Sequence, residues 1–192
     1  MRMTYALIGL GFLIIIGATY FFISTKKLET PTSTQTPMLT LTSSAFEKDA
    51  RIPAKYTCDG DNTSPPLLIS DVPAGTKSLI LIVSDPDVPK ALLPSGVFDH
   101  WALYNIPPET TEIPEGGVAG NPGLNGAGKD SYTGPCPPTE YEPTEHRYFF
   151  KLYALDTTLE FFKEPTAANL EAAVEGHTIE SAELMARYDR KR

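Results

Sequence analysis

The sequence predicts a mainly β domain, a sandwich of sheets that ends in two short helices and follows one membrane-spanning helix. A long uncharged apolar run lies near the N-terminus, and no similar run recurs. Further along, short segments rich in β-branched and aromatic residues alternate with proline and glycine clusters. Helical spacing of apolar residues occurs only after residue 165. We therefore divide the chain into an anchor (1–27), a linker (28–37) and a domain (38–192).

The apolar run from Tyr5 to Ile23 predicts the anchor. It contains no charge and is flanked by Arg2 on one side and by Lys26 and Lys27 on the other. At about 1.5 Å per residue, a helix of this length reaches roughly 28 Å, close to the ~30 Å hydrocarbon core of a bilayer. A cleaved signal peptide is the alternative, but its apolar part is usually about 7–15 residues long and precedes a small-x-small site. No such site follows this run, so we expect an uncleaved anchor.

The linker and the charge balance bear on location and partners. Residues 28–37 are rich in Ser, Thr and Pro, a composition typical of spacers outside cells, and we expect the domain to be extracytoplasmic. Residues 38–192 carry 13 basic and 23 acidic side chains, a net charge of −10. Such a surface repels nucleic acid and anionic lipid. The anchor alone is therefore expected to bring the domain to a membrane.

The segments expected to form strands have clear boundaries. Alternation predicts a half-buried strand over 38–43, and the β-branched run between Gly75 and Pro86 predicts a central strand over 78–84. Two more are predicted over 100–106 and 148–155. The loops between them, 85–97 and 114–145, are long, and long loops frequently carry function.

Two helices are predicted in the tail. Thr166 can cap a helix with Leu170 and Val174 on one face, and Gly176 is a suitable stop. A second helix is predicted from Thr178, with apolar residues on one face and arginines towards its C-terminus: Ile179, Ala182, Ala186, Arg187 and Arg190.

Three polar clusters lie at predicted strand–loop junctions. They are Asp85-Pro86-Asp87, His100, and the segment Tyr132 to Pro138 followed by His146-Arg147-Tyr148. Each alone has an ordinary structural explanation as a turn, a strand start or a rigid loop. Brought together by neighbouring strands, two imidazoles, an arginine and backbone N–H groups of the glycine loop would form an anion-sized pocket.

These motifs resemble those of the phosphatidylethanolamine-binding proteins, also called Raf-kinase-inhibitor-like proteins, and most closely the bacterial and archaeal branch. The resemblance covers roughly residues 40–190, with the motifs in the family's order. The matching stretches are Ile52-Pro53, Tyr56-Thr57-Cys58-Asp59-Gly60, Asp85-Pro86-Asp87-Val88-Pro89, His100-Trp101, Gly134-Pro135-Cys136-Pro137-Pro138 and His146-Arg147-Tyr148.

The resemblance implies a sandwich of two antiparallel sheets with short C-terminal helices. It also implies a small cavity for phosphate, acetate or a phospholipid headgroup, and no cofactor or metal. The ligand-binding residues carried over to this chain are Asp85, Asp87, His100, Tyr132, Gly134, Cys136, Pro137, His146 and Tyr148.

The leading interpretation is therefore a non-enzymatic, membrane-anchored module that binds a small anion. The resemblance also implies a protein kinase or protease as a target for inhibition. A hydrolase is the rival class, with Asp85, Asp87, His100 and His146 as metal ligands or Cys136 as nucleophile. The chain lacks both His-Glu-x-x-His and Gly-x-Ser-x-Gly, which disfavours this class. A structural interaction domain with a vestigial cavity is the third class.

The two cysteines, Cys58 and Cys136, leave two readings open. In a domain that faces the cytoplasm they would be independent reduced thiols. In a domain that faces outward they would be oxidised, and their pairing is the only intramolecular disulfide available.

Overall fold

The computed structural model describes residues 38–190. The predicted anchor (1–27) and linker (28–37) lie outside the described residues. Within residues 38–190, no helix has the length and apolar character needed to cross a membrane.

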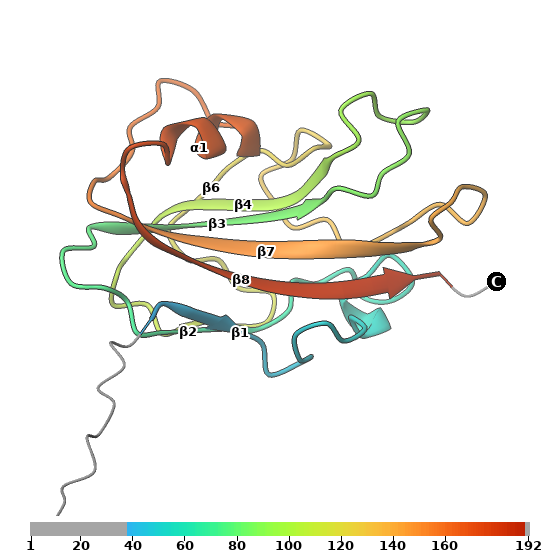
Figure 1. Cartoon of the computed structure of the whole chain (residues 1–192), viewed down its shortest axis with the longest axis horizontal. Coiled ribbons are helices and arrows are strands. Elements are labelled where there is room, and N and C mark those ends of the chain that lie inside the picture. Colours follow the sequence, from blue (N-terminus) through green and yellow to red (C-terminus); the bar gives the residue numbers. More distant parts are fainter. Residues whose placement is uncertain (1–37, 191–192) are drawn as a thin grey trace, which may run out of the picture. The chain divides into compact units, whose positions relative to one another are not determined.

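The described residues form two antiparallel sheets and one short α-helix (Figure 1). The larger sheet has the strand order β6-β4-β3-β7-β8, and the smaller has the order β1-β2-β5. The strand bounds are β1 Thr40–Thr42, β2 Leu67–Ser70, β3 Ser78–Asp85, β4 Phe98–Ile106, β5 Glu112–Ile113, β6 Asn121–Pro122, β7 Glu145–Leu155 and β8 Thr178–Asp189. The mainly β sandwich and its four predicted strands are therefore confirmed, while β2, β5 and β6 were not predicted.

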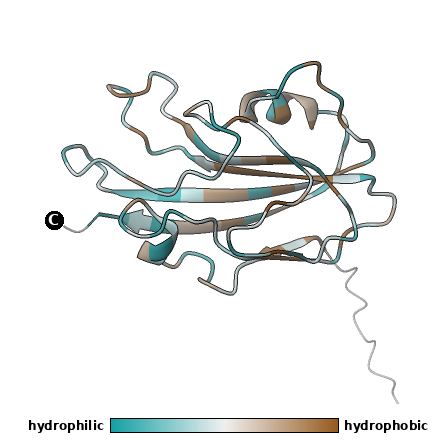
Figure 2. Ribbon diagram, turned by 180° about the vertical axis from the view of Figure 1, so that it is seen from behind, coloured by the Kyte–Doolittle hydropathy of each residue, from teal (hydrophilic) through white to brown (hydrophobic). Residues whose placement is uncertain are grey.

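Strand β3 lies at the centre of the molecule and is buried along its whole length. Leu79, Leu81 and Val83 point into the core between the two sheets. Ile80 and Ile82 point to the opposite face, which α1 covers. Figure 1 shows α1 and the smaller sheet on opposite sides of the larger sheet. In Figure 2, hydrophobic residues accordingly concentrate along the central strands.

The first predicted helix is confirmed as α1, Ala167–Ala173. The Thr166 hydroxyl accepts from the Asn169 N–H, and the Asn169 side chain accepts from the Thr166 N–H, a reciprocal cap. Leu170 is fully buried against Ile80 and Ile82, in the hydrophobic cluster between α1 and the larger sheet.

The second predicted helix is wrong, because these residues form strand β8, Thr178–Asp189. Strand β8 pairs with β7 along its whole length, from Leu155 opposite Thr178 to Glu145 opposite Asp189. Ala182 and Ala186, which suggested a helical face, also fit alternation, with four inward side chains: Ala182, Leu184, Ala186 and Tyr188. Ile179, the third residue of the expected helical face, is instead exposed. Burial of this face and the β7 hydrogen bonds outweigh the helix propensity of the Ala- and Glu-rich sequence.

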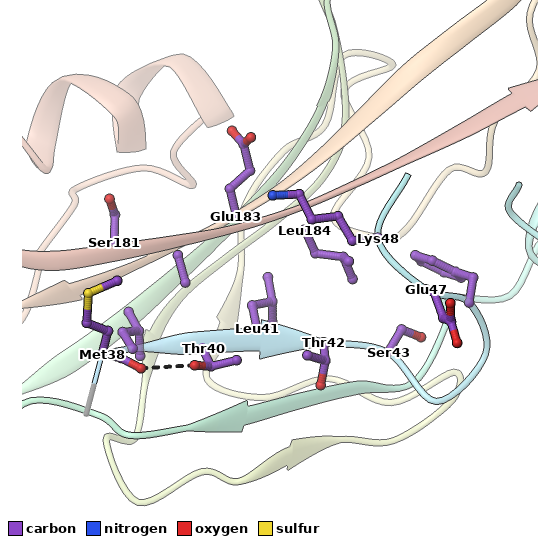
Figure 3. Close-up of a pocket in the computed structure, with 13 residues that line it drawn as sticks. Met38, Thr40, Leu41, Thr42, Ser43, Glu47, Lys48, Ser181, Glu183 and Leu184 are labelled. Carbon is purple, nitrogen blue, oxygen red and sulfur yellow. Dashed lines mark hydrogen bonds between the residues drawn. The ribbon is translucent and has the colours of Figure 1, made fainter. Parts of the chain in front are cut away.

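Strand β8 is an edge of the larger sheet, and the segment Asp49–Ile52 covers part of it. Asp49 N–H donates to Met185 O, Ile52 N–H donates to Arg187 O, and Arg187 N–H donates to Ala50 O. Further towards the start of β8, its edge and that of β1 border a hollow of about 650 Å³ (Figure 3). Leu41 and Leu184 in this hollow belong to the core between the sheets.

Candidate functional site

The strand order brings the predicted polar clusters together. Strand β3 runs antiparallel to its neighbours β4 and β7. The C-terminal end of β3 therefore lies beside the N-terminal ends of the other two strands. Asp85 is the last residue of β3, His100 is the third residue of β4, and His146 is the second residue of β7.

These three residues line one cavity of about 440 Å³. Of the nine predicted ligand-binding residues, the cavity is lined by Asp85, His100, Gly134, Cys136, Pro137 and His146. Asp87, Tyr132 and Tyr148 do not line it. Lining residues that the sequence reading missed are Val88, Leu92, Leu93, Phe98, Gly126, Thr133 and Pro138. Most of them lie in the two long loops, whose length already indicated a functional role.

The Asp85 carboxylate orients His146. His146 Nδ1 lies 2.7 Å from Asp85 Oδ2, and both side chains are almost completely buried. The other oxygen, Oδ1, accepts from the Asp87 N–H at 2.9 Å. Since an ionised carboxylate only accepts, His146 donates from Nδ1, and Nε2 is the ring atom left for other partners.

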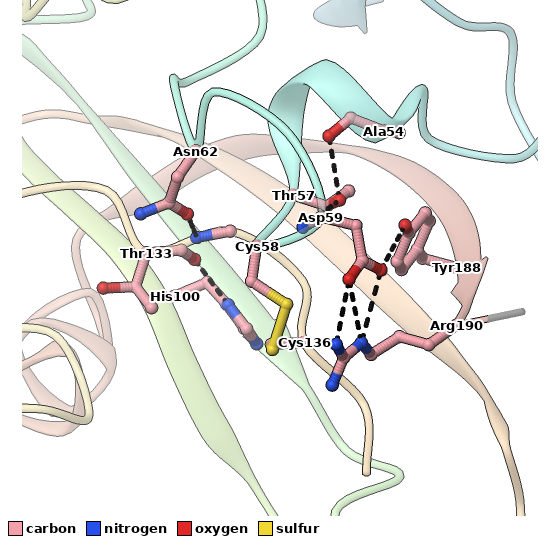
Figure 4. The surroundings of a disulfide bond; sticks show 11 residues. Ala54, Thr57, Cys58, Asp59, Asn62, His100, Thr133, Cys136, Tyr188 and Arg190 are labelled. Atoms are coloured by element: carbon pink, nitrogen blue, oxygen red, sulfur yellow. Dashed lines mark hydrogen bonds and ion pairs between the residues drawn. A yellow bond between two sulfur atoms is a disulfide. The ribbon is translucent and has the colours of Figure 1, made fainter. Parts of the chain in front are cut away.

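The Thr133 carbonyl orients His100 from the other side of the site (Figure 4). His100 Nδ1 donates to Thr133 O at 2.6 Å. His100 Nε2 lies 4.0 Å from Asp85 Oδ2. Burial lowers the pKa of His100, and the Thr133 carbonyl and the Asp85 charge oppose this only in part. His100 is therefore neutral at pH 7, with a lone pair on Nε2.

Three buried polar atoms at this end of the sandwich have no hydrogen-bond partner among the described residues: His100 Nε2, His146 Nε2 and Tyr148 Oη. The Tyr148 ring packs edge-on against His100, with centroids 5.2 Å apart. Burial, and then the Asp85 charge, raise the pKa of Tyr148, so its hydroxyl keeps its proton. Buried polar groups are normally paired, so such a concentration is typical of a ligand site.

Asp87 and Arg147 form an ion pair beside the cavity. The Arg147 guanidinium donates to both Asp87 oxygens at 2.7 and 2.8 Å, and its backbone N–H donates to Oδ2 at 2.9 Å. The Arg147 hydrogen bonds hold the pKa of Asp87 below its usual range. Arg147 was expected to line the pocket, but it does not; its ion pair instead joins the end of β3 to the start of β7.

The glycine loop is held by contacts within the fold. Gly134 N–H donates to Asn62 Oδ1 at 2.7 Å, and the Tyr132 hydroxyl donates to Tyr56 O at 2.8 Å. The expected role of the Gly134 N–H as an anion donor is not supported, because this group is already engaged. Glycine is required here, since a Cβ would lie 2.6 Å from Tyr56 O and 2.9 Å from Thr57 Cα.

A disulfide joins Cys58 to Cys136, with Cα atoms 5.4 Å apart (Figure 4). Beside it, Cys58 N–H donates to Pro135 O at 3.1 Å. Asp59 accepts from the Tyr188 hydroxyl at 2.8 Å and from Arg190 Nε at 3.0 Å. This network ties the proline-rich wall of the cavity to the segment after the 3-10 helix Ala54–Tyr56 and to the end of β8.

Two observations concern the residues that a hydrolase was expected to use. Cys136 in a disulfide has no thiolate to act as nucleophile. Across residues 38–190, no group of three or more His, Cys, Asp or Glu residues is placed to hold a metal ion.

Comparison with known proteins assigns the family. The family model for phosphatidylethanolamine-binding protein matches residues 42–189. A UPF0098 protein of Chlamydia pneumoniae is 47% identical over 151 residues, which cover 78% of this chain and 98% of that protein. A UPF0098 protein of Pyrococcus abyssi is 46% identical over 158 residues, which cover 78% and 84%.

Solved structures of similar proteins support the same family. A putative phosphatidylethanolamine-binding protein homolog from Chlamydia trachomatis is 44% identical, with a TM-score of 0.75 over 81% of this chain and 99% of that chain. E. coli YbcL, described as a new member of the mammalian family, is 29% identical, with a TM-score of 0.70 over 80% and 99%. The chain therefore belongs to the phosphatidylethanolamine-binding protein family, among bacterial and archaeal members, and carries a domain of binding type.

Proposed function

We propose that the domain is a non-enzymatic module that binds a small oxyanion, a phosphate or carboxylate group, in the cavity at the end of β3. The observation that carries this proposal is a pair of buried imidazole Nε2 atoms that have no partner within residues 38–190 and are held at one cavity by Asp85 and Thr133. Buried polar atoms without partners raise the free energy of the folded protein, and a ligand that forms hydrogen bonds with them lowers it again.

The charges of the site support this ligand class. A proton on His146 Nε2 would create a donor for an oxyanion, and the Asp85 carboxylate at 2.7 Å would balance the imidazolium charge. The cavity volume of about 440 Å³ suits a small molecule. Its apolar lining of Leu92, Leu93 and Phe98 would exclude water around the bound group.

We also propose that residues 1–27 hold the domain at a membrane, with the domain outside the cytoplasm. The disulfide supports this location, because disulfides persist mainly in oxidising compartments. A phospholipid headgroup is then one source of the oxyanion, and a free phosphorylated metabolite is another.

The test is a titration of the full-length protein with O-phosphorylethanolamine, followed through the ring C–H resonances of its three histidines by NMR. His100 and His146 should shift, and replacement of each by Gln assigns their signals. His177 is the internal control, because it is exposed and pairs with Asp156 away from the cavity. Ethanolamine, which lacks the phosphate, should shift neither cavity histidine. If millimolar O-phosphorylethanolamine leaves both unchanged, the proposal fails.

A further inference from the structure

We propose that the cavity selects oxyanions that carry an acidic proton of their own, above all the monoanion of a phosphate monoester or phosphonate. This inference rests on the proposed function and names the ligand class of the same site. It starts from the way each histidine is held, because that decides which hydrogen-bonding partners the ligand must supply.

His100 is held as an acceptor. Its Nδ1 proton is committed to the Thr133 carbonyl at 2.6 Å, so a neutral ring has only a lone pair left on Nε2. Burial opposes a second proton, because the residue is only 4% exposed and its ring packs against Tyr148, with centroids 5.2 Å apart. The ligand must therefore offer a donor to His100.

Asp85 makes the need for a donor stronger. Its Oδ2 lies 4.0 Å from His100 Nε2, so two buried acceptors face each other without a proton between them. Facing acceptors in a site shielded from water repel each other, because neither can satisfy the other. A P–OH group of the ligand would supply the missing donor to Nε2.

His146, in contrast to His100, can act as a hydrogen-bond donor to the ligand. With Nδ1 bonded to Asp85, a protonated His146 presents Nε2–H as a donor for a P–O⁻ oxygen. The cavity then offers one acceptor and one charged donor, which matches HO–P–O⁻. A sulfate ester or a phosphodiester has oxygens for His146 and no proton for His100.

In the part of the chain that the structure describes, few other charged groups act on these two rings. From β3 they face Asp85 and, beyond it, Asp87, whose charge Arg147 of β7 neutralises. From β7 the Tyr148 ring packs against His100, and its hydroxyl keeps its proton; β4 contributes the uncharged Phe98 ring, whose centroid lies 4.8 Å from that of His100. The loop contributes the Thr133 carbonyl. The selection therefore depends on the two imidazoles and Asp85.

The experiment compares four small ligands on the full-length protein by the same histidine NMR titration. Methyl phosphate and methylphosphonate can carry a P–OH, while methyl sulfate and dimethyl phosphate have none. At pH 6, Kd for methyl phosphate should be at least tenfold lower than for methyl sulfate or dimethyl phosphate. Dimethyl phosphate represents the phosphodiester of an intact phospholipid headgroup, so this arm also separates that source from free phosphate monoesters.

A pH series separates the ligand's proton from the protein's protons. Affinity for methyl phosphate should fall above the second pKa of the ester, which is about 6 by analogy with phosphoserine. Methylphosphonate has a higher second pKa, so its affinity should fall at correspondingly higher pH. A change in the protonation of the protein itself affects both ligands alike and produces no such difference between them.

The outcomes are distinct. A preference for the P–OH ligands, with a fall in affinity that follows each ligand's own pKa, supports the inference. Equal binding of methyl sulfate or dimethyl phosphate, or one common pH midpoint, overturns the inference and leaves the proposed function standing. Failure of all four ligands to shift His100 and His146 overturns both.

Discussion

His146 donates from Nδ1 to Oδ2 of Asp85 at 2.7 Å across 61 positions of sequence, and both side chains are almost completely buried. The pair connects the end of β3 to the start of β7, and it decides which imidazole nitrogen is available at the cavity. Asp85 thus has a positioning role, and its effect on a ligand passes through His146.

Replacement of Asp85 by Asn should weaken both the fold and the site. The change removes the charged acceptor of His146, and loss of such a buried hydrogen bond costs about 1–3 kcal/mol of unfolding free energy. Urea denaturation measures this loss. Asp87→Asn is the matched control from the same Asp-Pro-Asp motif. The side chain of its partner Arg147 is 45% exposed, so the cost there should stay below about 1 kcal/mol. Equal losses would refute the special role of Asp85.

Stability should fall in mildly acidic solution because of His100. Burial lowers its pKa in the folded state, so below the ordinary value of 6.5 the unfolded chain binds a proton that the native ring does not take up. The unfolding free energy should therefore drop as pH falls below 6.5, by up to about 1.4 kcal/mol per pH unit for this one group. Denaturation at a series of pH values tests this, and His100→Asn should remove that part of the slope. His177→Asn is the control, since His177 is exposed, and an equal effect there would contradict the prediction.

Removal of the disulfide should destabilise the domain strongly. Cys58 and Cys136 are 78 positions apart, and closing a loop of this length contributes about 4–5 kcal/mol in the chain-entropy model. The double replacement of both cysteines by Ser should lower the unfolding free energy accordingly. Two titratable thiols in the purified, unreduced protein would show that the bond does not form.

Gly134→Ala should displace the cavity wall. The new Cβ would meet the backbone of Tyr56 and Thr57, and such overpacking typically costs about 1–3 kcal/mol. Asn62→Ala is the companion variant, because it removes the acceptor of the Gly134 N–H without adding an atom. Both should weaken binding of O-phosphorylethanolamine in the NMR titration. Wild-type affinity in both variants would show that the loop has no part in the site.

A fragment that begins at Met38 should be soluble and folded, with the same histidine shifts as the full chain. The first strand starts at Thr40, and Met38 is 71% exposed, so the cut breaks no buried contact of that side chain. Circular dichroism and the NMR titration test this. If the fragment aggregates while one that begins near residue 24 stays soluble, the boundary at residue 38 is wrong.

The sequence was a good guide wherever burial alone decides structure. Strand β3 is buried on both faces, and its uninterrupted β-branched run identifies it. The prediction for β8 failed because Ala182 and Ala186, four positions apart, fit helical and alternating spacing equally well. Only its long-range pairing with β7 decides between them. The two-residue strands β5 and β6 are too short to leave a periodic pattern.

Some residues of the candidate site could likewise be predicted from the sequence, and others could not. His100, His146 and Asp85 could be predicted, since antiparallel neighbours bring the ends of their strands together. The partners that orient the rings and the loop were less visible. The Thr133 carbonyl and the Asn62 amide act through contacts between distant loops, and no local pattern marks them.

The segment that covers part of the β8 edge affects how readily copies of the protein can associate through their sheets. An open sheet edge can recruit a strand from another molecule and start aggregation. Along the second half of β8, the backbone groups of Met185 and Arg187 are already occupied by the Asp49–Ile52 segment. An incoming strand would first have to displace this segment, including the fully buried Ile52. This half of the β8 edge is thereby protected from pairing with a strand of another molecule, even where many copies are crowded together.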